Sequence, residues 1–406
     1  MLVSPRPIPR EVWVLVSASF VIALGYGIVA PVLPLYAVEF NVSNTAASAI
    51  ISSFALMRLL FAPASGWLIQ RFGEKRVYLS GLTIVAISTG ACAFAQVYWQ
   101  LLVLRSIAGI GSTMFTVAVM GLLIHMSPPD LRARISSLYA GSFLIGGIAG
   151  PTLGSLLAGL GLRAPFLIYA LSLFVACIVV GTTLGKVSAD QPGVTDSRPT
   201  MSLRAALLQP PYRAALASNF ANGWSSFGVR VALVPLFMAA MSTDTTAAAL
   251  ALTAFAVGNA AVIIPAGRWS DLHGRRPFII AGLAITGLST VFFGFSSELW
   301  IALVLAVIAG VGTGLLGPSQ QAAVADVIGQ KARGGQVLST FQMSADLGAV
   351  LGPLLIGLVA DAFGFGPAFA VTGMLLLVAA VWWTFTGDTR ERTLTQEIPI
   401  VRTNEP

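Results

Sequence analysis

Twelve apolar stretches of helical length follow one another along this chain, and they restrict its fold more than any other feature of the sequence. A helix needs about 20 apolar residues, at about 1.5 Å of rise each, to cross the hydrocarbon core of a membrane. The stretches lie at about 12–36, 45–69, 77–95, 98–126, 135–160, 164–185, 213–240, 246–267, 277–296, 299–328, 335–361 and 367–387. Only 10% of the residues are charged, against roughly 25% in soluble domains. The sequence therefore predicts an all-α membrane protein with twelve transmembrane helices, and it leaves too little chain outside them for a membrane-tethered enzyme.

The basic residues gather on one side of the predicted helices. Of 23 Lys and Arg residues, 19 fall in the loops and tails on the side of the N-terminus, Arg163 falls on the other side, and three fall within spans. Short loops rich in Lys and Arg stay in the cytoplasm, so we predict a multi-pass protein of the cell membrane with both termini cytoplasmic. The net charge of +7 then reflects topology and indicates no nucleic-acid partner, since such binding needs basic residues clustered on one face.

One long polar stretch divides the predicted helices into six and six. It is rich in Pro, Gly, Ser and Asp, as loops are, and we predict a cytoplasmic linker there. The expected organisation is a cytoplasmic N-terminus (1–11), an N-terminal six-helix bundle (12–185), the linker (186–212), a C-terminal six-helix bundle (213–387) and a cytoplasmic tail (388–406).

The two halves repeat one another. At an offset of 201 residues, YGIVAPVLPLY of the first helix aligns with FGVRVALVPLF of the seventh, and GWLIQRFGEKR with GRWSDLHGRR. Glycines and prolines recur at matched positions: Gly27 with Gly228, Pro34 with Pro235, Gly109 with Gly310 and, after one inserted residue, Pro151 with Pro353. Six helices repeated in the same orientation predict two pseudo-symmetric six-helix bundles, as in transporters whose substrate path lies between the halves near mid-membrane.

With these repeats, the chain resembles the major facilitator superfamily from about residue 10 to 388. That family has a loop signature after its second helix: glycine, three residues, aspartate, two residues, glycine and basic residues. The first copy here has Gly66, Gly73, Lys75 and Arg76, with Gln70 in place of the aspartate; the second has Gly267, Asp271, Gly274, Arg275 and Arg276. The resemblance implies a cytoplasmic gate, in which glycine allows close helix approach and the acid caps a helix or pairs with Arg across the halves. The Gln70 departure weakens that expectation for the first copy.

The fourth and fifth helices resemble two further motifs of the family. LVLRSIAGIG presents Arg105 before two glycines, and the antiporter motif is matched by Gly146, Gly150, Pro151 and Gly154, with Ser155 in place of its last glycine. Glycines at these intervals give a small-residue face, and proline kinks the helix, so we expect a hinge or a proton-tight seam, with plain helix packing as the alternative. Together these motifs resemble the twelve-helix drug:proton antiporter branch.

Four ionisable residues lie well inside the spans: Arg58, Arg105, Arg230 and Asp346. Each costs about 2.5 to 3.5 kcal/mol at a helix centre, so they are expected to face a cavity and not lipid. One acid cannot pair with three arginines, so backbone carbonyls, water or substrate must satisfy at least two guanidinium groups. We predict that Arg105 and Arg230 line an electropositive substrate cavity, and that Arg58 braces the first bundle.

Asp346 is the only acid well inside a span and is the first candidate for carrying a coupling proton. Burial and a nearby arginine act on a carboxyl in opposite directions, and their balance can bring it into a range where it gains and loses a proton. The alternative is a permanent Asp–Arg strut between helices. Asp271, at the membrane edge, is a second candidate for coupling and a better one for the gate.

The family's use of its first and seventh helices implies a cavity lined by Tyr26, Asn222, Trp224 and Phe227, although any one aromatic could serve packing alone. Exporters of cationic drugs in this branch carry an acid in the first helix, and this chain has none between Val12 and Val38. A positive, aromatic cavity suits neutral or weakly anionic amphiphiles.

The sequence predicts no metal site, cofactor or enzymatic centre. Cys92 and Cys177 both lie in apolar runs, and no P-loop or HExxH motif is present. We therefore predict a proton-coupled exporter of small amphipathic molecules that works by alternating access, with protons, substrate and the lipid bilayer as its partners, and as a monomer. The alternatives are an importer or facilitator of a sugar or organic anion and, in another class, a non-transporting receptor or scaffold.

Overall fold

In the computed structural model, the described residues are 8–126, 132–157, 160–184, 201–242, 246–329 and 335–389, and all regular structure within these ranges is helical. The predicted linker at 186–212 falls partly outside them, and so do parts of the predicted N-terminus and tail. The described part of the linker contains the short helix α8 (Leu203–Leu207) and the first residues of α9.

The first half contains α1 (Arg10–Val29), α2 (Val32–Val38), α3 (Asn44–Phe72), α4 (Glu74–Cys92), α5 (Tyr98–Met126), α6 (Arg132–Leu157) and α7 (Ala164–Thr183). The second contains, after α8, α9 (Pro210–Asn222), the π-helical segment η2 (Gly223–Val229), α10 (Arg230–Met241), α11 (Ala247–His273), α12 (Arg276–Phe293), α13 (Leu299–Ile328), α14 (Gly335–Phe363) and α15 (Phe365–Thr384). Two spans are interrupted: α1 and α2 form one that breaks at Pro31, and α9, η2 and α10 form another.

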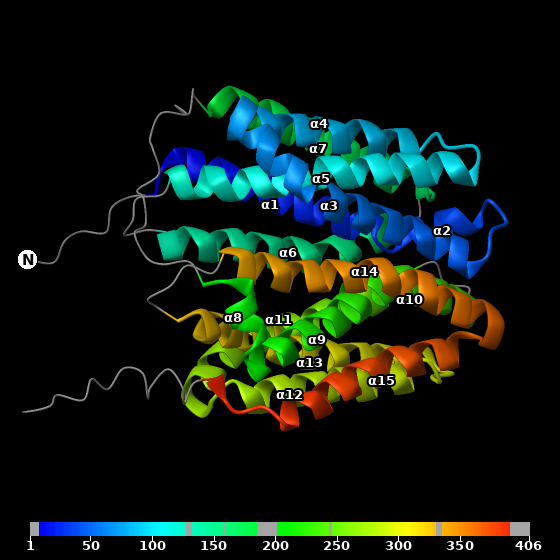
Figure 1. Cartoon of the computed structure of the whole chain (residues 1–406). Helices are drawn as coiled ribbons and strands as arrows, with labels where there is room; N and C mark the ends of the chain where they lie inside the picture. The colour runs from blue at the N-terminus through cyan, green and yellow to red at the C-terminus, as the bar shows by residue number, and fades with distance from the viewer. Residues whose placement is uncertain are drawn as a thin grey trace, which may run out of the picture.

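Within the described ranges, ten spans are long and apolar enough to cross a membrane. The two remaining long helices, α4 and α6, lie beside these spans with their axes roughly parallel to them (Figure 1). The first turn of α4 carries Glu74, Lys75 and Arg76, which shortens its apolar part. These twelve membrane helices form two bundles, α1–α7 and α9–α15, and the predicted fold is confirmed.

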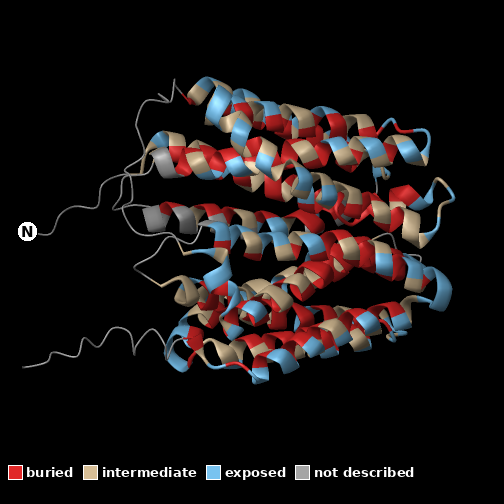
Figure 2. Cartoon of the chain, in the orientation of Figure 1, coloured by how far each residue is buried: buried red, intermediate tan, exposed pale blue. Residues whose placement is uncertain are grey.

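Large apolar side chains point outward from both bundles. Leu60 and Leu171 are 61% and 66% exposed, and Trp300 is 66% exposed. Exposed residues lie along the outer faces of the helices, while buried ones lie between them (Figure 2). In water such a surface would aggregate, whereas in a bilayer it is the surface that lipid tails cover.

Glycines let the helices of each bundle approach closely. A Cβ atom on Gly150 of α6 would lie 2.6 Å from the Cα of Gly27 in α1, and one on Gly154 would lie 2.8 Å from a carbonyl oxygen of α1. In the second half, a Cβ on Gly348 would collide with the carbonyl oxygen of Phe220. The small-residue faces therefore pack within each half, α6 on α1 and α14 on α9 and η2. The Ser155 side chain lies outside the described part.

A buried polar network joins four helices of the second half. The indole of Trp383 donates to Ser218 Oγ (3.1 Å), Ser218 donates to Gln320 Oε1 (2.8 Å), and Gln320 donates to Asn219 Oδ1 (2.8 Å). Asn219 then donates to the carbonyl of Phe341 at 2.6 Å. At an offset of 201, the first half has Ala18 and Val119 in place of Asn219 and Gln320, so the repeat does not carry this network.

Replacing Gln320 with leucine is expected to destabilise the second half. The change leaves Ser218 and Asn219 buried with partners missing, and a buried unsatisfied polar group costs about 1–3 kcal/mol. Thermal unfolding of the detergent-solubilised protein should therefore begin at a lower temperature. Gln321→Leu, at an exposed neighbouring position, is the matched control, and equal effects of the two changes would contradict the importance of the network.

Candidate transport pathway

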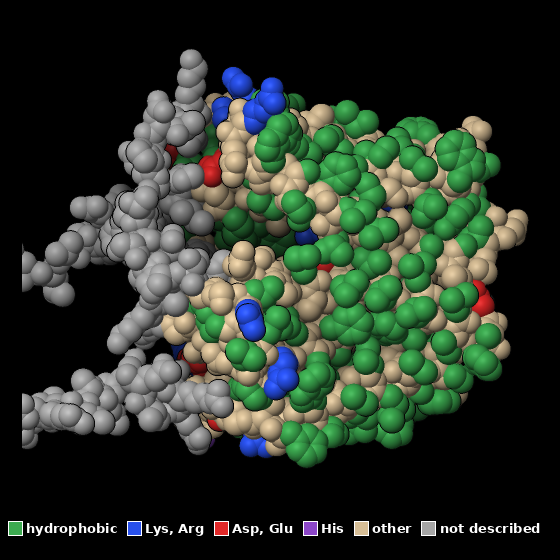
Figure 3. Space-filling model, viewed as in Figure 1, with side chains coloured by type: hydrophobic (Ala, Val, Ile, Leu, Met, Phe, Trp, Pro, Cys, Tyr) green, Lys and Arg blue, Asp and Glu red, His purple; other side chains and the backbone are tan. Residues whose placement is uncertain are grey.

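A hollow runs into the molecule between the two halves (Figure 3). It lies nearer the end at which α1 begins and α3 and α11 finish, here called the basic end because Arg71, Arg76 and Arg276 lie there. The other end, here called the opposite end, carries Asn44 and Asp361.

The opposite end is closed by a contact between α3 and α14. The Asp361 carboxylate of α14 accepts hydrogen bonds from the backbone N–H groups of Asn44 and Thr45, each at 2.9 Å, and from the Thr45 hydroxyl. A Cβ atom on Gly357 would lie 2.8 Å from the Cα of Thr45, so the two helices touch there. An acid of one half thus caps the first turn of a helix in the other half, where anions are favoured.

The same two helices place Arg58 and Asp346 at one depth. Arg58 lies 14 residues along α3 from Asn44, and Asp346 lies 15 residues along α14 from Asp361. Since α3 and α14 run in opposite directions, both residues are about 21–23 Å from the closed end. The half-buried Asp346 carboxylate is acted on by the Arg58 charge across the interface and by Gln342 one turn away.

Arg58 is held against the first bundle. Its Nη1 donates to Ser112 Oγ of α5 at 2.6 Å, and Thr113 Oγ1 donates to the Arg58 carbonyl at 3.2 Å. These bonds fix α3 to α5 and leave the guanidinium charge near the interface with α14.

Aromatic rings lie against the guanidinium groups of the other two arginines, Arg105 and Arg230. The guanidinium carbon of Arg105 lies 4.6 Å from the centroid of the Phe54 ring, and that of Arg230 lies 3.1 Å from the centroid of the Phe255 ring. Such cation–π contacts are attractive, more so where water is excluded. The Nε of Arg105 has no hydrogen-bond partner among the described residues. From the sequence, carbonyls, water or substrate are the expected partners of these arginines, and the ring contacts are not predicted. Phe54 and Phe255 nevertheless match at the offset of 201.

The predicted cavity residues of the first and seventh spans lie in different surroundings. Tyr26 is 37% exposed and its ring centroid is 6.4 Å from that of Phe54, which places it beside the arginines of the first half. Asn222 accepts a hydrogen bond from Ser226 at 2.8 Å. Trp224 is buried against α14, while Phe227 is 60% exposed. The structure thus groups Tyr26 with the arginines of the first half and packs Trp224 inside the second half.

The second copy of the loop signature forms a cluster within the second half. Arg275 forms ion pairs with Asp271 and with Asp326 of α13, the latter at 3.2 Å. Burial lowers the pKa of Arg275, but its bonds to these two carboxylates outweigh burial and raise the pKa overall. Arg276 donates to the carbonyls of Trp383 and Thr384 at the end of α15. Asp271 therefore pairs with an arginine of its own half in this arrangement.

Two acids of this cluster, Asp326 and Asp388, have no acidic counterpart in the first half. Asp388 accepts from the backbone N–H groups of Arg275 and Arg276, both at 3.2 Å, and Thr389 donates to Asp326 at 3.1 Å. At the offset of 201, Asp326 corresponds to a histidine, so comparing the halves does not find it.

The first copy of the signature shares its glycine geometry with the second. Gly73 and Gly274 both have positive φ, +82° and +95°, which explains why glycine stands at both positions. Lys75 donates to the carbonyl of Leu184, while Arg76 is exposed. A Cβ on Gly66 would meet nothing within 4 Å, and one on Gly267 would come no closer than 3.9 Å to Pro318. Among the described residues, the close helix approach expected at these two glycines is therefore absent.

The sequence profile of the Major Facilitator Superfamily matches the chain twice, over residues 15–218 and 215–402. The chain belongs to this superfamily. It is 29% identical over 353 residues to the class C tetracycline resistance protein of Escherichia coli, covering 82% of this chain and 85% of that protein. It is 22% identical to the quinolone resistance protein NorA of Staphylococcus aureus (strain COL), covering 90% and 94%.

Solved structures of this superfamily share the fold. A bacterial homologue of the human lysosomal transporter Spinster, inward-facing and unoccupied, superposes with a TM-score of 0.79 at 17% identity, covering 97% of this chain and all of that one. A D-xylose–proton symporter superposes with a TM-score of 0.75 at 16% identity, covering 93% and 98%. This member of the Major Facilitator Superfamily is a multi-pass membrane transporter and not an enzyme, and its relatives place it near drug exporters of the drug:proton antiporter type.

Proposed function

We propose that this transporter exports small amphipathic molecules in exchange for protons. The observation that supports this most directly is the position of Asp346. It is the only acid deep within the described spans, and it shares its depth with Arg58 across the interface between the halves. A carboxyl group at that place can link its protonation to the distance between α3 and α14.

The positive-inside rule orients the cycle. The basic end faces the cytoplasm under that rule, so we assign the hollow, which lies nearer that end, to the cytoplasmic side and the Asp361 contact to the outer seal. Asp346 is then accessible from the cytoplasm, where it releases its proton and substrate enters. After the halves rock, the opposite end opens, substrate leaves and Asp346 takes a proton from outside.

The attraction between Asp346 and Arg58 supplies the physical link. An ionised Asp346 is drawn to Arg58 through a medium of low dielectric constant, where Coulomb attraction is strong. A protonated Asp346 loses this attraction, which changes the relative stability of the two arrangements of α3 and α14. Arg58 also bonds Ser112, so the charge moves with the first bundle as a rigid part of it.

The walls of the path favour neutral or weakly anionic amphiphiles. Tyr26 and Phe54 present rings, and Arg58 and Arg105 present positive charge, all in the first half. Rings supply apolar contact area, and arginines attract electron-rich groups. The names of the relatives, tetracycline and quinolone resistance proteins, are consistent with cargo of drug size.

We assign the cluster of Asp271, Arg275 and Asp326 to the cytoplasmic gate, and the α1–α6 contact at Gly146, Gly150 and Pro151 to a seam that stays closed. The seam brings α6 against α1 without an intervening side chain, since a Cβ on Gly146 would lie 2.7 Å from that of Ala23. Such packing leaves no room for a water chain between these two helices.

The test is transport in proteoliposomes with an imposed pH gradient, using neutral, anionic and cationic fluorescent amphiphiles. Flux through the wild-type protein should follow the gradient, and Asp346→Asn should reduce that dependence at least tenfold because the side chain no longer titrates. Asp346→Glu keeps the carboxyl group and should retain part of the coupling. Flux that ignores the gradient in all three proteins would overturn proton coupling and favour a facilitator or importer.

A further inference from the structure

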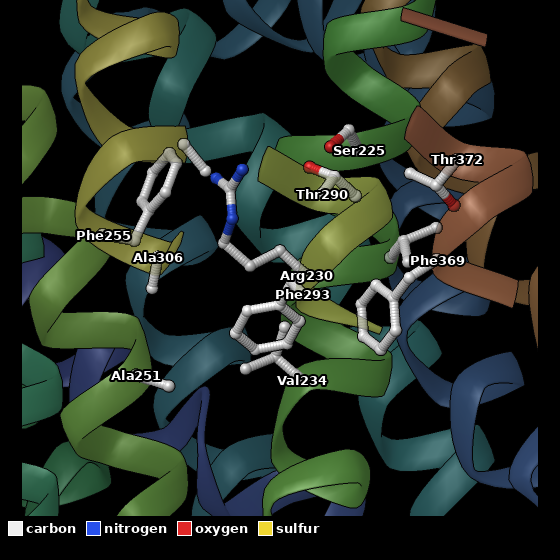
Figure 4. A pocket seen from close by; sticks show the side chains of 12 residues that line it. Ser225, Arg230, Val234, Ala251, Phe255, Thr290, Phe293, Ala306, Phe369 and Thr372 are labelled. Carbon is white, nitrogen blue, oxygen red and sulfur yellow. The ribbon is translucent and has the colours of Figure 1, made fainter. Parts of the chain in front are cut away.

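A small, partly open pocket lies within the second bundle (Figure 4). Its lining residues all belong to the second half, and they come from η2, α10, α11, α12, α13 and α15. Its volume is about 30 Å³, room for about two water molecules at ~10–15 Å³ each. An amphipathic substrate is far too large for this space.

Arg230 is the only charged residue that lines the cavity. Figure 4 shows its guanidinium between the Phe255 ring and the Thr290 and Ser225 side chains. The ring contact satisfies one face of the cation, but the five N–H donors of a guanidinium lie in its plane and point elsewhere. Among the described residues, no carboxylate forms an ion pair with Arg230.

Four acids in the described part of the second half have other neighbours. Asp271 and Asp326 bond Arg275, and Asp361 bonds the first turn of α3. Asp346 lies on α14, which does not contribute to the pocket, and it shares its depth with Arg58 of the other half. A cation buried among apolar walls requires a compensating partner, and no acid of the described chain fills that role for Arg230.

The hydroxyl groups of the cavity walls carry no negative charge. Thr290 donates to the carbonyl of Thr286 at 2.7 Å, and Thr372 donates to that of Ala368 at 3.1 Å. Each hydroxyl hydrogen is therefore used, and both hydroxyl oxygens can only accept further hydrogen bonds. Ser225 lies at the same wall and its hydroxyl is positioned to donate to a guest beside Arg230 (Figure 4).

The internal repeat explains how the cavity arises. Phe255 occupies the place of Phe54, and Ala306 occupies the place of Arg105, whose guanidinium lies on the Phe54 ring. In the second half the cation comes from Arg230 instead, at the position of Val29. Each bundle therefore has a guanidinium on an equivalent ring, but the short side chain of Ala306 leaves empty the space that Arg105 fills in the first half.

We propose that this cavity binds a monovalent inorganic anion of chloride size, held by the Arg230 guanidinium and the Ser225 hydroxyl. The anion neutralises the Arg230 charge, and a pocket of about 30 Å³ has room for an ion of this size. Because every lining residue belongs to one bundle, the anion stabilises that bundle without taking part in the exchange between the halves. This inference is independent of the proposed function.

The first experiment measures thermal unfolding of the purified transporter in sodium chloride and in sodium gluconate at equal ionic strength. The wild-type protein should melt roughly 3 °C or more higher in chloride, as expected for a ligand that binds only the folded state. Arg230→Met should abolish the difference. Arg105→Met, which removes the equivalent cation of the first half, is the matched control and should keep it. No difference for the wild-type protein, or a difference that survives Arg230→Met, would overturn the proposal.

A second measurement is independent of the variants and remains decisive if Arg230→Met does not fold. Wild-type crystals grown in sodium bromide should show an anomalous difference peak within hydrogen-bonding distance of Arg230. Ordered water at that place, with no anomalous signal, would overturn the proposal. Ser225→Ala should weaken the peak while leaving it in position.

Discussion

Replacing Asp361 with alanine is expected to shift the resting transporter away from the arrangement that is closed at the opposite end. The change removes the acceptor of three hydrogen bonds that join α14 to the first turn of α3. Hydrogen bonds to charged groups contribute about 1.5–3 kcal/mol each when buried, and solvent at this exposed site reduces that figure. A net loss of about 1.4 kcal/mol would change the ratio of the two arrangements tenfold.

Spin labels at the exposed residues Asn41 and Phe363 would report this shift as a longer distance in pulsed electron resonance. Glu298→Ala is the matched control, because it removes an exposed carboxylate at the same end of the same half. Thr45→Val should have a smaller effect, since it keeps both backbone donors. A distance distribution for Asp361→Ala that matches the wild-type one would show that the helix cap does not hold the outside closed.

The second large effect is expected at the contact between α1 and α6. Gly150→Ala would place a methyl group 2.6 Å from the Cα of Gly27, a distance at which backbone must move. Overpacking of this kind costs about 1–3 kcal/mol or more. We expect lower expression, a lower melting temperature and, in the protein that remains, proton leak across the separated helices.

Gly147→Ala is the control for that prediction, because it lies in the same helix and a Cβ there would meet nothing within 4 Å. It should behave like the wild-type protein in expression, melting and proton tightness. Equal behaviour of the two variants would mean that α1 and α6 separate readily and do not form a seam.

The fold is predictable because each span is specified by its own apolar run, and because the six-helix pattern occurs twice. Bilayer thickness fixes the length of each apolar run, and the offset of 201 shows that one six-helix unit occurs twice. The interruptions were less visible. The apolar run 12–36 predicts one continuous helix. In the structure, Pro31 is instead the N-terminal cap of a separate helix, α2. The π-helical segment Gly223–Val229 has no distinct pattern in the sequence.

The site was harder to predict, since sequence gives the depth of a residue but not its direction around the helix. Arg230 directly follows η2, and an extra residue in a π-helical turn rotates the next part of the helix by about 100°. Counting from the helix end gives Arg230 a depth that suits a substrate cavity. It does not show that the side chain lies in a pocket of the second bundle. Asp326 and Asp388 were missed because their partner, Arg275, is reached only through tertiary packing.

The cap on α3 has a consequence for how the protein is made. The first turn of α3 has one side-chain cap of its own, in which Ser43 accepts from the amide of Ala46. The carboxylate that binds the amides of Asn44 and Thr45 belongs to Asp361, more than 300 residues later in the chain. During synthesis, the first turn of α3 therefore lacks this carboxylate until the eleventh span has been made. The contact that joins the halves at the opposite end can thus form only late in synthesis, after most of the chain has been made.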